Sequence, residues 1–193
     1  MRELTYFVAV SLDGFIAAPD DTFDAFPMQG AHIDWLIEEW PDTLPGFVLD
    51  AVGAKADNAH FDAVLMGWGT YAAGFPQGVT DPYPHLQSFV VTHHPEREVP
   101  GDTGELTITD EDPVALVRRL KQEEGSGIWL CGGGQLASSL VDEIDRLVIK
   151  VNPVLLGDGK RIFAQRPYAP QGFELTATRS FDTGVVANSY VRR

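Results

Sequence analysis

The chain has 193 residues, 44% of them hydrophobic and 22% charged, which is typical of one soluble globular domain with its own core. Its formal net charge of −14 argues against nucleic acid and anionic membrane surfaces as partners, because both would repel it. The single cysteine, Cys131, excludes an internal disulfide, and no apolar run is long enough for an export signal or a membrane span. We therefore expect a cytoplasmic protein that binds small molecules.

The spacing of apolar residues predicts the elements of the first half of the chain. The run from Leu4 to Val10 shows little alternation, which predicts a central strand. Apolar residues recur at helical spacing from Ile33 to Trp40 and predict a helix that Pro41 ends. The further elements expected are a weaker helix over residues 47–58, a buried strand over 63–66, a short helix over 68–73 with Thr70 as its cap, and strands over 88–92 and 106–108.

The second half of the chain begins with a clearly marked helix. Asp112 and Pro113 are a cap and a first-turn proline, and Gly125 closes the helix they open. Residues 146–156 predict a long strand, in which Pro153 indicates an edge position or a bulge.

The last segments predict the fold class. Residues 173–181 and 185–191 alternate on either side of a turn over 182–184, which predicts an antiparallel hairpin. Strands and helices alternate before it. We therefore expect a single α/β domain over residues 1–193, with a mostly parallel central sheet and an antiparallel C-terminal hairpin.

A glycine-rich corner, Gly132-Gly133-Gly134-Gln135-Leu136, joins a predicted strand to a predicted helix. Such a corner lacks Cβ atoms and exposes N–H groups at the start of a helix, which suits a phosphate. The alternative is a tight turn, although three glycines are more than a turn needs. The corner also matches the Gly-x-Gly-x-x-Ala fingerprint of a Rossmann fold, but too few strand–helix units follow for that fold. We expect an anion site.

A second corner of the same kind is Gly67-Trp68-Gly69-Thr70. Two corners at the carboxyl ends of parallel strands can hold one ligand with several phosphates. Thr92 and His93 end the next strand with Arg97 close behind, and they offer donors and positive charge to a ribose 2′-phosphate. The alternative for this third segment is a solvated polar turn.

Three further side chains each allow a functional and a structural interpretation. Asp13, after the first strand, can donate or orient a proton, or it can form an Asp-Gly turn; both remain open. Asp34 fits a helix cap better than an acid, and Trp35 fits packing better than stacking on a ligand. We expect no metal site, because neither His-Glu-x-x-His nor paired Cys-x-x-Cys is present.

Six ordered stretches span nearly the whole chain: Ser11-Leu12-Asp13-Gly14-Phe15-Ile16-Ala17, Ile33-Asp34-Trp35-Leu36, Met66-Gly67-Trp68-Gly69-Thr70-Tyr71, Val91-Thr92, Gly132-Gly133-Gly134-Gln135-Leu136 and Pro153-Val154-Leu155-Leu156-Gly157-Asp158-Gly159-Lys160-Arg161-Ile162-Phe163. In this order they resemble the reductase domain of riboflavin biosynthesis, the RibD C-terminal domain family of the dihydrofolate reductase-like superfamily. The resemblance implies a dihydrofolate reductase-like three-layer sandwich that binds NADPH, with NADH as the alternative cofactor. Family members often pair, which implies a homodimer.

The resemblance also implies roles for individual residues. The glycine-rich corner at 132–136 would bind the pyrophosphate, and Asp13 would stand near the hydride acceptor. The remaining implied contacts are Gly67, Trp68 and Thr70 with the adenosine side and its phosphates, Thr92 and His93 with the 2′-phosphate, Ala9, Val10 and Ala17 with the nicotinamide, and Asp34 and Trp35 with the substrate.

The activity implied is an NADPH-dependent reduction. Hydride would pass to a C=N or C=O carbon of a small heterocyclic or ribosylamino-pyrimidine-like substrate. One alternative is dihydrofolate reduction, which Asp34 pointing into the cleft would favour; another is a dinucleotide-binding protein without turnover. The zinc-deaminase motifs that are often fused to the biosynthetic enzyme are absent, so the chain resembles its reductase half only.

Overall fold

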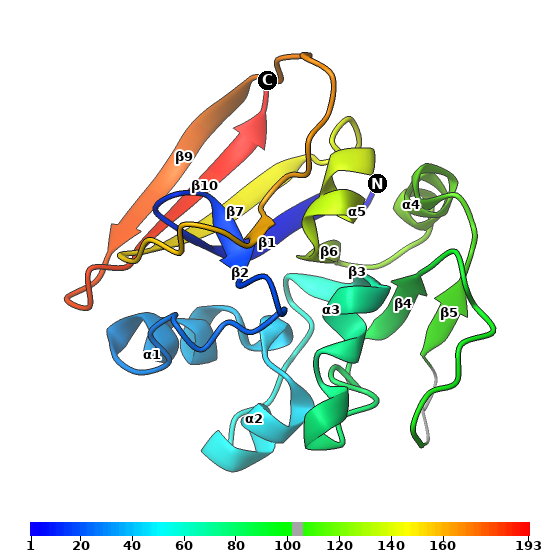
Figure 1. The fold of residues 1–193 in the computed structure, drawn as a ribbon, viewed down its shortest axis with the longest axis horizontal. Helices are drawn as coiled ribbons and strands as arrows, with labels where there is room; N and C mark the ends of the chain where they lie inside the picture. The colour runs from blue at the N-terminus through cyan, green and yellow to red at the C-terminus, as the bar shows by residue number, and fades with distance from the viewer. Residues whose placement is uncertain (102–105) are drawn as a thin grey trace.

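An eight-stranded sheet forms the centre of the molecule, in the order β5-β4-β3-β6-β1-β7-β10-β9 (Figure 1). The structure is a computed structural model and describes residues 1–101 and 106–193. The strands of this sheet are β1 (Leu4–Ser11), β3 (Phe61–Gly67), β4 (Gln87–Val91), β5 (Thr107–Thr109), β6 (Gly127–Gly132), β7 (Arg146–Asn152), β9 (Phe173–Ser180) and β10 (Val186–Arg192). Two short strands, β2 (Phe15–Ala17) and β8 (Lys160–Arg161), pair with each other separately.

The pairing confirms the predicted mostly parallel sheet with an antiparallel C-terminal hairpin. Strands β5, β4, β3, β6, β1 and β7 are parallel to one another, whereas β10 is antiparallel to both β7 and β9. The register places Gly67 beside Val91 and Met66 beside Gly132. The ends of these strands therefore share one edge of the sheet. We call the side where β1, β3, β4, β6 and β7 end the carboxyl edge, and the side where they begin the amino edge.

Helices cover both faces of the sheet and make the fold a three-layer sandwich (Figure 1). They are α1 (Ala31–Glu39), α2 (Gly46–Val52), α3 (Trp68–Ala72), α4 (Pro113–Gln122) and α5 (Gly134–Ser139), with 3₁₀ turns η1 (Pro41–Thr43) and η2 (Phe75–Gln77). Side chains of α1, α2 and α3 pack on one face, and those of α4 and α5 on the other. Within the described ranges, no helix combines the length and apolar character needed to cross a bilayer.

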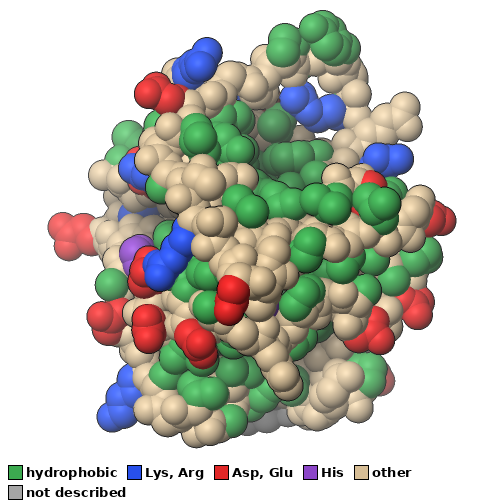
Figure 2. Space-filling view, turned by 90° about the vertical axis from the view of Figure 1, so that its left-hand side faces the viewer, with side chains coloured by type: hydrophobic (Ala, Val, Ile, Leu, Met, Phe, Trp, Pro, Cys, Tyr) green, Lys and Arg blue, Asp and Glu red, His purple; other side chains and the backbone are tan. Residues whose placement is uncertain are grey.

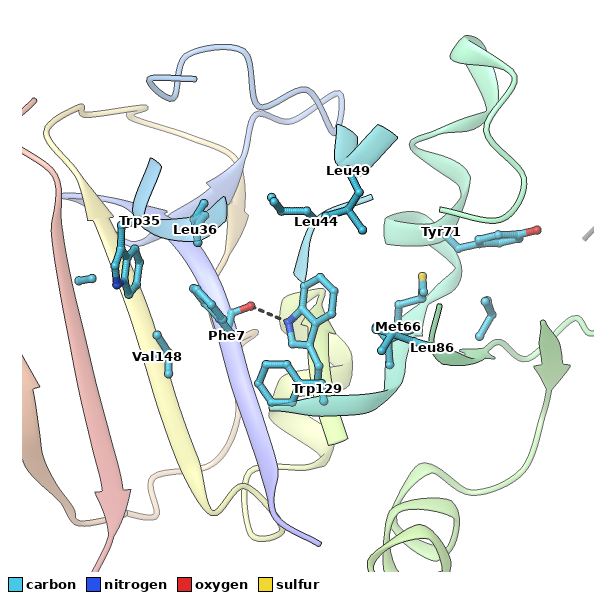
Figure 3. Close-up of a cluster of buried hydrophobic side chains, with 14 residues drawn as sticks. Phe7, Trp35, Leu36, Leu44, Leu49, Met66, Tyr71, Leu86, Trp129 and Val148 are labelled. Atoms are coloured by element: carbon cyan, nitrogen blue, oxygen red, sulfur yellow. Dashed lines mark hydrogen bonds between the residues drawn. The ribbon is translucent and has the colours of Figure 1, made fainter. Parts of the chain in front are cut away.

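The side chains of β1 alternate between the two faces. Phe7 packs with Trp35 and Val148 on the α1 side, while Tyr6 and Val8 belong to the cluster of α4 and α5 (Figure 3). Both faces of β1 are thus buried, which explains why the run from Leu4 to Val10 lacks polar alternation. Trp129 Nε1 donates to the Phe7 carbonyl oxygen at 3.0 Å, so burial leaves the indole N–H with a partner.

The capping prediction was confirmed at one helix and wrong at another. Asp112 caps α4, because its Oδ1 accepts a hydrogen bond from Ala115 N at 2.9 Å. Thr70 does not cap α3: the helix begins at Trp68, Gly67 is its N-cap, and Thr70 lies inside the helix. The helix starts at Trp68, directly after β3, so Thr70 is its third residue and not its cap.

The prediction for Pro153 was also wrong. Strand β7 ends at Asn152 and lies between β1 and β10, so Pro153 marks neither an edge strand nor a bulge. It follows the strand, where a missing N–H removes no bond from the ladder.

Candidate functional site

The glycine-rich corner lies where β6 ends and α5 begins. Ala137 N donates to Gly133 O at 3.0 Å and starts the helix. None of the described residues accepts a hydrogen bond from the N–H groups of Gly134, Gln135 or Leu136. These are the groups that every helix start leaves without internal partners. Since α5 has only six residues, an anion here would be held by these N–H groups and not by a long helix dipole.

The three glycines of this corner differ in whether the fold itself requires a glycine at their position. Gly132 has a φ of 154°, which favours glycine, and a Cβ on Gly134 would lie 2.0 Å from the Arg161 carbonyl oxygen. Gly133 has an ordinary φ of −100°, and a Cβ there would meet nothing closer than Thr70 Oγ1, at 3.6 Å. The chain itself therefore requires glycine at the first and third positions only. A missing Cβ at Gly133 leaves room for something outside the chain.

The second corner touches the first. Thr70 Oγ1 lies 3.3 Å from the position that a Cβ on Gly132 would take, although the two residues belong to α3 and β6. A Cβ on Gly67 or Gly69 would meet nothing within 4 Å, so no contact within the chain requires glycine at these two positions. The Thr70 hydroxyl makes no hydrogen bond within the described part of the chain. Free N–H groups, a hydroxyl and open glycine backbone thus meet at the carboxyl edge.

The segment after β4 lies against the second corner. The guanidinium of Arg97 stands over the Trp68 ring, 5.1 Å from its centroid. Thr92 Oγ1 accepts from His94 N at 3.1 Å, so part of its capacity is used inside its own turn, and His93 is exposed. Arg97 therefore brings a positive charge to the place where the sequence predicts a 2′-phosphate.

The residues predicted to flank a nicotinamide lie along β1 and β2. Ala9 is half-buried, Val10 is buried, and the carbonyl oxygen of Ala17 lies 2.1 Å from where a Cβ on Gly159 would sit. Ile16, which the sequence did not single out, reaches to 3.9 Å from the Cβ position of Gly133. Strand β2 therefore borders the glycine-rich corner.

Asp13 is held as a carboxylate by three donors. Ser11 Oγ donates to its Oδ1 at 2.6 Å, Leu156 N to the same oxygen at 3.1 Å, and Gly157 N to Oδ2 at 2.7 Å. The serine hydrogen bond first, and then the backbone donors, lower the pKa of Asp13 to about 2. At neutral pH this group has no proton to give. Of the two interpretations left open, the geometry favours a turn that ties the loops after β1 and β7 together; the catalytic role stays a prediction.

The two residues predicted to contact substrate lie apart from the glycine-rich corner, on α1. Trp35 is buried, and its Nε1 donates to Glu39 Oε2 at 2.8 Å. Its ring packs against Phe181 and against Phe7, which Figure 3 shows beside it. This geometry favours the packing interpretation. Asp34 is exposed in the first turn of α1, where the N-cap is Gly30 and no side chain caps the helix.

Sequence reasoning missed Lys150. It lies in β7, and burial lowers its pKa to about 8. No carboxylate pairs with its ammonium group in the described ranges. One signal for it exists in the sequence: a lone charge inside the apolar run from Leu147 to Val151.

A cavity of about 560 Å³ lies at the amino edge, away from these groups. Its lining includes Thr5, Trp40, His60 and Tyr190, and none of the predicted site residues. Ligands of open α/β sheets bind outside the carboxyl ends of the strands. We therefore place the candidate site at the carboxyl edge.

Comparisons with known proteins agree with this fold. The family described as the RibD C-terminal domain matches residues 2–187. The chain is 30% identical to the uncharacterized protein YwjB of Bacillus subtilis (strain 168), over 99% of this chain and 98% of that one. It is 26% identical to the uncharacterized protein YyaP of the same organism, over 98% and 94% of the two chains.

Two solved structures are similar. A protein from Shewanella sp. PV-4 that is assigned to riboflavin biosynthesis superposes with a TM-score of 0.73 at 21% identity, covering 100% of this chain and 99% of that one. A diaminohydroxyphosphoribosylaminopyrimidine deaminase/5-amino-6-(5-phosphoribosylamino)uracil reductase from Thermotoga maritima superposes with a TM-score of 0.62 at 17% identity. This chain is covered completely, but it spans only 57% of the Thermotoga protein.

Proposed function

The chain belongs to the RibD C-terminal domain family, and from this premise we propose that it is an NADPH-dependent reductase. Its substrate would be a small heterocyclic or ribosylamino-pyrimidine-like compound with a C=N or C=O bond. The substrate class follows the name of the Thermotoga protein, whose reductase acts on a ribosylaminouracil. The family supports a reductase; the cofactor and the substrate are the parts that we propose.

One observation carries the cofactor proposal. No contact within the described chain requires glycine at positions 67, 69 and 133. All three lie near Thr70, whose hydroxyl has no hydrogen-bond partner among the described residues. Close approach of a ligand to bare backbone is the usual reason for such glycines. The residues present therefore fit a dinucleotide, whose pyrophosphate would accept hydrogen bonds from the first N–H groups of α5. When bound, the dinucleotide would supply hydride.

The negative charge of the chain limits which groups can supply the affinity for a dinucleotide. With a net charge of −14, the protein repels a polyphosphate at long range, so the affinity must come from local donors. Arg97, held over Trp68, is a cation near the proposed adenosine end. We assign the preference for NADPH over NADH to this arginine, together with Thr92 and His93.

The test is a fluorescence titration with NADPH that compares two glycine variants. Gly133→Val should weaken binding at least about 100-fold, or roughly 2.7 kcal/mol, because its side chain would occupy the space of the phosphates. Gly172→Val is the matched control: this glycine lies outside the site, and a Cβ there would meet only the Arg193 side chain, at 3.5 Å. Equal NADPH affinity in the two variants would overturn the phosphate assignment.

A substrate panel then separates the alternatives. Oxidation of NADPH by 5-amino-6-(5-phosphoribosylamino)uracil would support the proposed substrate class, and oxidation by dihydrofolate would favour a dihydrofolate reductase. Binding of NADPH without oxidation by any compound of a broad panel would favour a dinucleotide-binding protein. The exposed position of Asp34 does not by itself favour a pteridine substrate.

We also propose that the protein acts as a homodimer in the cytoplasm. Seven of the eight residues of β9 are exposed, and Leu175 on this strand is 53% exposed. Figure 2 faces the side of β9 and of the turn before β10, and hydrophobic side chains line a hollow in its upper half. A second copy of the chain would cover this side. Light scattering should give twice the chain mass, and Leu175→Asp should reduce it; a wild-type mass of one chain would contradict the dimer.

A further inference from the structure

Lys150 lies near the carboxyl end of β7. Its register partners are Ala9 on β1 and Ala187 on β10, two small side chains that leave space above them. Side chains two residues apart along a strand share a face, so Lys150 lies on the same face as Val148. Figure 3 shows that α1 covers this face through Trp35, with Val148 beneath it.

Lys150 is half-buried, and its ammonium lacks the partners that the buried Lys121 has. Lys121 Nζ lies 2.7 Å from Asp145 Oδ2 and donates to the Glu143 carbonyl oxygen at 2.6 Å. Lys150 has neither an ion pair nor a hydrogen bond to its side chain in residues 1–101 and 106–193. An ammonium that is partly removed from water and has no counter-charge costs stability, which a purely structural role does not explain.

The elements packed around Lys150 offer it no opposite charge. On β1 and β10 the neighbouring side chains of this face are Phe7, Ala9, Ala187 and Ser189, of which none is charged. The titratable groups of α1 are His32, Asp34, Glu38 and Glu39. His32 is occupied by Pro27 O and Thr183 Oγ1, and Glu39 by Trp35 and Arg179. Burial is the only cause that lowers the pKa of Lys150.

A second polar group next to Lys150 also lacks a partner. Asn152 is 1% exposed and lies on the same face, two residues further along β7. Its Nδ2 donates to the Val10 carbonyl oxygen at 3.2 Å, but its buried Oδ1 has no hydrogen-bond partner in the described part of the chain. The carboxyl end of β7 thus holds one donor, Lys150 Nζ, and one buried acceptor, Asn152 Oδ1, that no described residue satisfies.

The position of Lys150 relates it to the proposed cofactor site. Strand β1 alone separates β7 from β6, which ends in the glycine-rich corner. Two strand spacings amount to about 10 Å. A ligand whose pyrophosphate lies at that corner can therefore reach Ala9, the neighbour of Lys150, with its nicotinamide end.

We propose that Lys150 is the proton donor to the bond that this enzyme reduces, an inference that rests on the proposed reductase function. The substrate carbon gains a hydride from the reduced nicotinamide, and the electron pair of the C=N or C=O bond moves onto the nitrogen or oxygen. That atom takes a proton from Lys150 Nζ, and the neutral amine regains one from water. The substrate bond is reduced by two electrons and the dihydronicotinamide is oxidised.

Lys150 suits this step better than Asp13 does. An acid works best with a pKa near the operating pH, and the pKa of Lys150 is about 8. Asp13, with a pKa of about 2, is ionised at neutral pH and its oxygens are occupied by three donors. It can hold the loops of the site but has no proton to donate.

The deciding experiment observes the lysine itself. The chain has four lysines, at positions 55, 121, 150 and 160, so protein labelled with ¹³C and ¹⁵N in lysine gives few signals, and the signal missing in Lys150→Arg is that of Lys150. We expect this signal to titrate near pH 8 and to shift when NADP⁺ saturates the protein. Adenosine 2′,5′-bisphosphate, which lacks the nicotinamide, should leave it in place.

Two negative results are distinguishable. If tryptophan fluorescence shows that NADP⁺ binds, but Lys150 titrates near 10.4 or its signal does not move, the proposal for Lys150 is overturned while the reductase proposal stands. If NADP⁺ does not bind at all, the proposed function fails and the role of Lys150 fails with it.

Turnover adds a second readout. With any compound of the panel that is reduced, Lys150→Met should lose about 100-fold or more in kcat and keep the NADPH affinity of the wild type. The wild-type kcat should fall as the pH rises above about 8, because the amine then has no proton. An unchanged kcat and pH profile in Lys150→Met would overturn the proposal, whereas Lys55→Met, an exposed control, should change neither.

Discussion

The two edges of the parallel sheet differ in how their lysine side chains are paired: Lys121 at the amino edge has an ion pair, and Lys150 at the carboxyl edge has none among the described residues. At the amino edge the charged groups have partners: Arg2 pairs with Asp62, Lys121 with Asp145, and the Asp42 carboxylate accepts three backbone N–H groups. Single atoms there, Arg2 Nε, Asn58 Oδ1 and Ser88 Oγ, have no partner among the described residues. At the carboxyl edge Lys150, the Thr70 hydroxyl and the first N–H groups of α5 have none among the described residues. Satisfied polar groups fix a fold, whereas unsatisfied ones at a strand end are the ones available to a ligand. The contrast predicts that removing a paired polar group lowers the stability of the protein, whereas replacing an unpaired group at the carboxyl edge does not.

The largest effect is expected from Asp42→Ala at the amino edge. Asp42 is 0% exposed, and it accepts from Asn58 N and His60 N at 2.9 Å and from Phe61 N at 3.1 Å. Its removal leaves three donors without partners, so the free energy of unfolding should fall by about 4 kcal/mol in urea titrations. A loss below about 1 kcal/mol would show that the three hydrogen bonds to Asp42 contribute little to the stability of the fold.

Lys121 and Lys150 should respond to substitution in opposite directions. Lys121→Met breaks a buried ion pair and should lower the free energy of unfolding by about 2 kcal/mol. Lys150→Met removes an unpaired charge and should raise it at pH 7, by at most about 3 kcal/mol. A destabilising Lys150→Met would mean that the ammonium has a stabilising partner.

The pH dependence of the Lys150→Met effect follows from its pKa. The folded-state pKa, about 8, lies below the ordinary value of 10.5, so folding is penalised fully below about pH 8. The penalty declines as the pH rises from 8 and is gone above 10.5. Thermal melts of the two proteins should therefore converge at high pH, and a constant difference would contradict the unpaired state of Lys150.

A smaller effect is expected from Arg97→Ala at the carboxyl edge. If Arg97 contacts the 2′-phosphate, the variant should lose about tenfold in NADPH affinity, or roughly 1.4 kcal/mol, and little in NADH affinity. Calorimetric titration with both cofactors measures the ratio. Equal losses for the two would assign Arg97 to the packing of Trp68.

The smallest effect is expected from Asp13→Asn. The Asp13 carboxylate has a folded-state pKa of about 2, below the ordinary 3.8, so the stability that it contributes is present above pH 3.8 and lost as the pH falls through 2. The variant should have a lower Tm than the wild type at pH 7, and the difference should shrink between these two pH values. NADPH affinity should not change; a strong loss would place Asp13 at the cofactor.

Much of the fold could be predicted because local rules and tertiary structure agree. Apolar runs predict the buried strands, and the Asp112-Pro113 pair predicts the start of α4. The predictions failed where the start or end of an element is set by residues that are distant in the sequence. Thr70 looks like a cap in sequence, but α3 begins earlier, and Pro153 lies just beyond a strand whose end no local pattern marks.

The candidate site divides in the same way. Glycine clusters at strand ends are visible in sequence, and the structure brings two of them into contact at Thr70. The distinction between Gly133, which faces open space, and Gly134, which is forced by the Arg161 backbone, depends on residues far away in the chain. So does the unpaired state of Lys150, because a lysine's partners are set by the packing of three other elements.

The most direct test of the central claim is a binding titration of the wild-type protein with NADPH and NADH, followed by tryptophan fluorescence. We expect saturable quenching by NADPH at micromolar concentration and weaker binding of NADH. If neither dinucleotide binds, the carboxyl edge is not a dinucleotide site, and the glycines around Thr70 need another explanation.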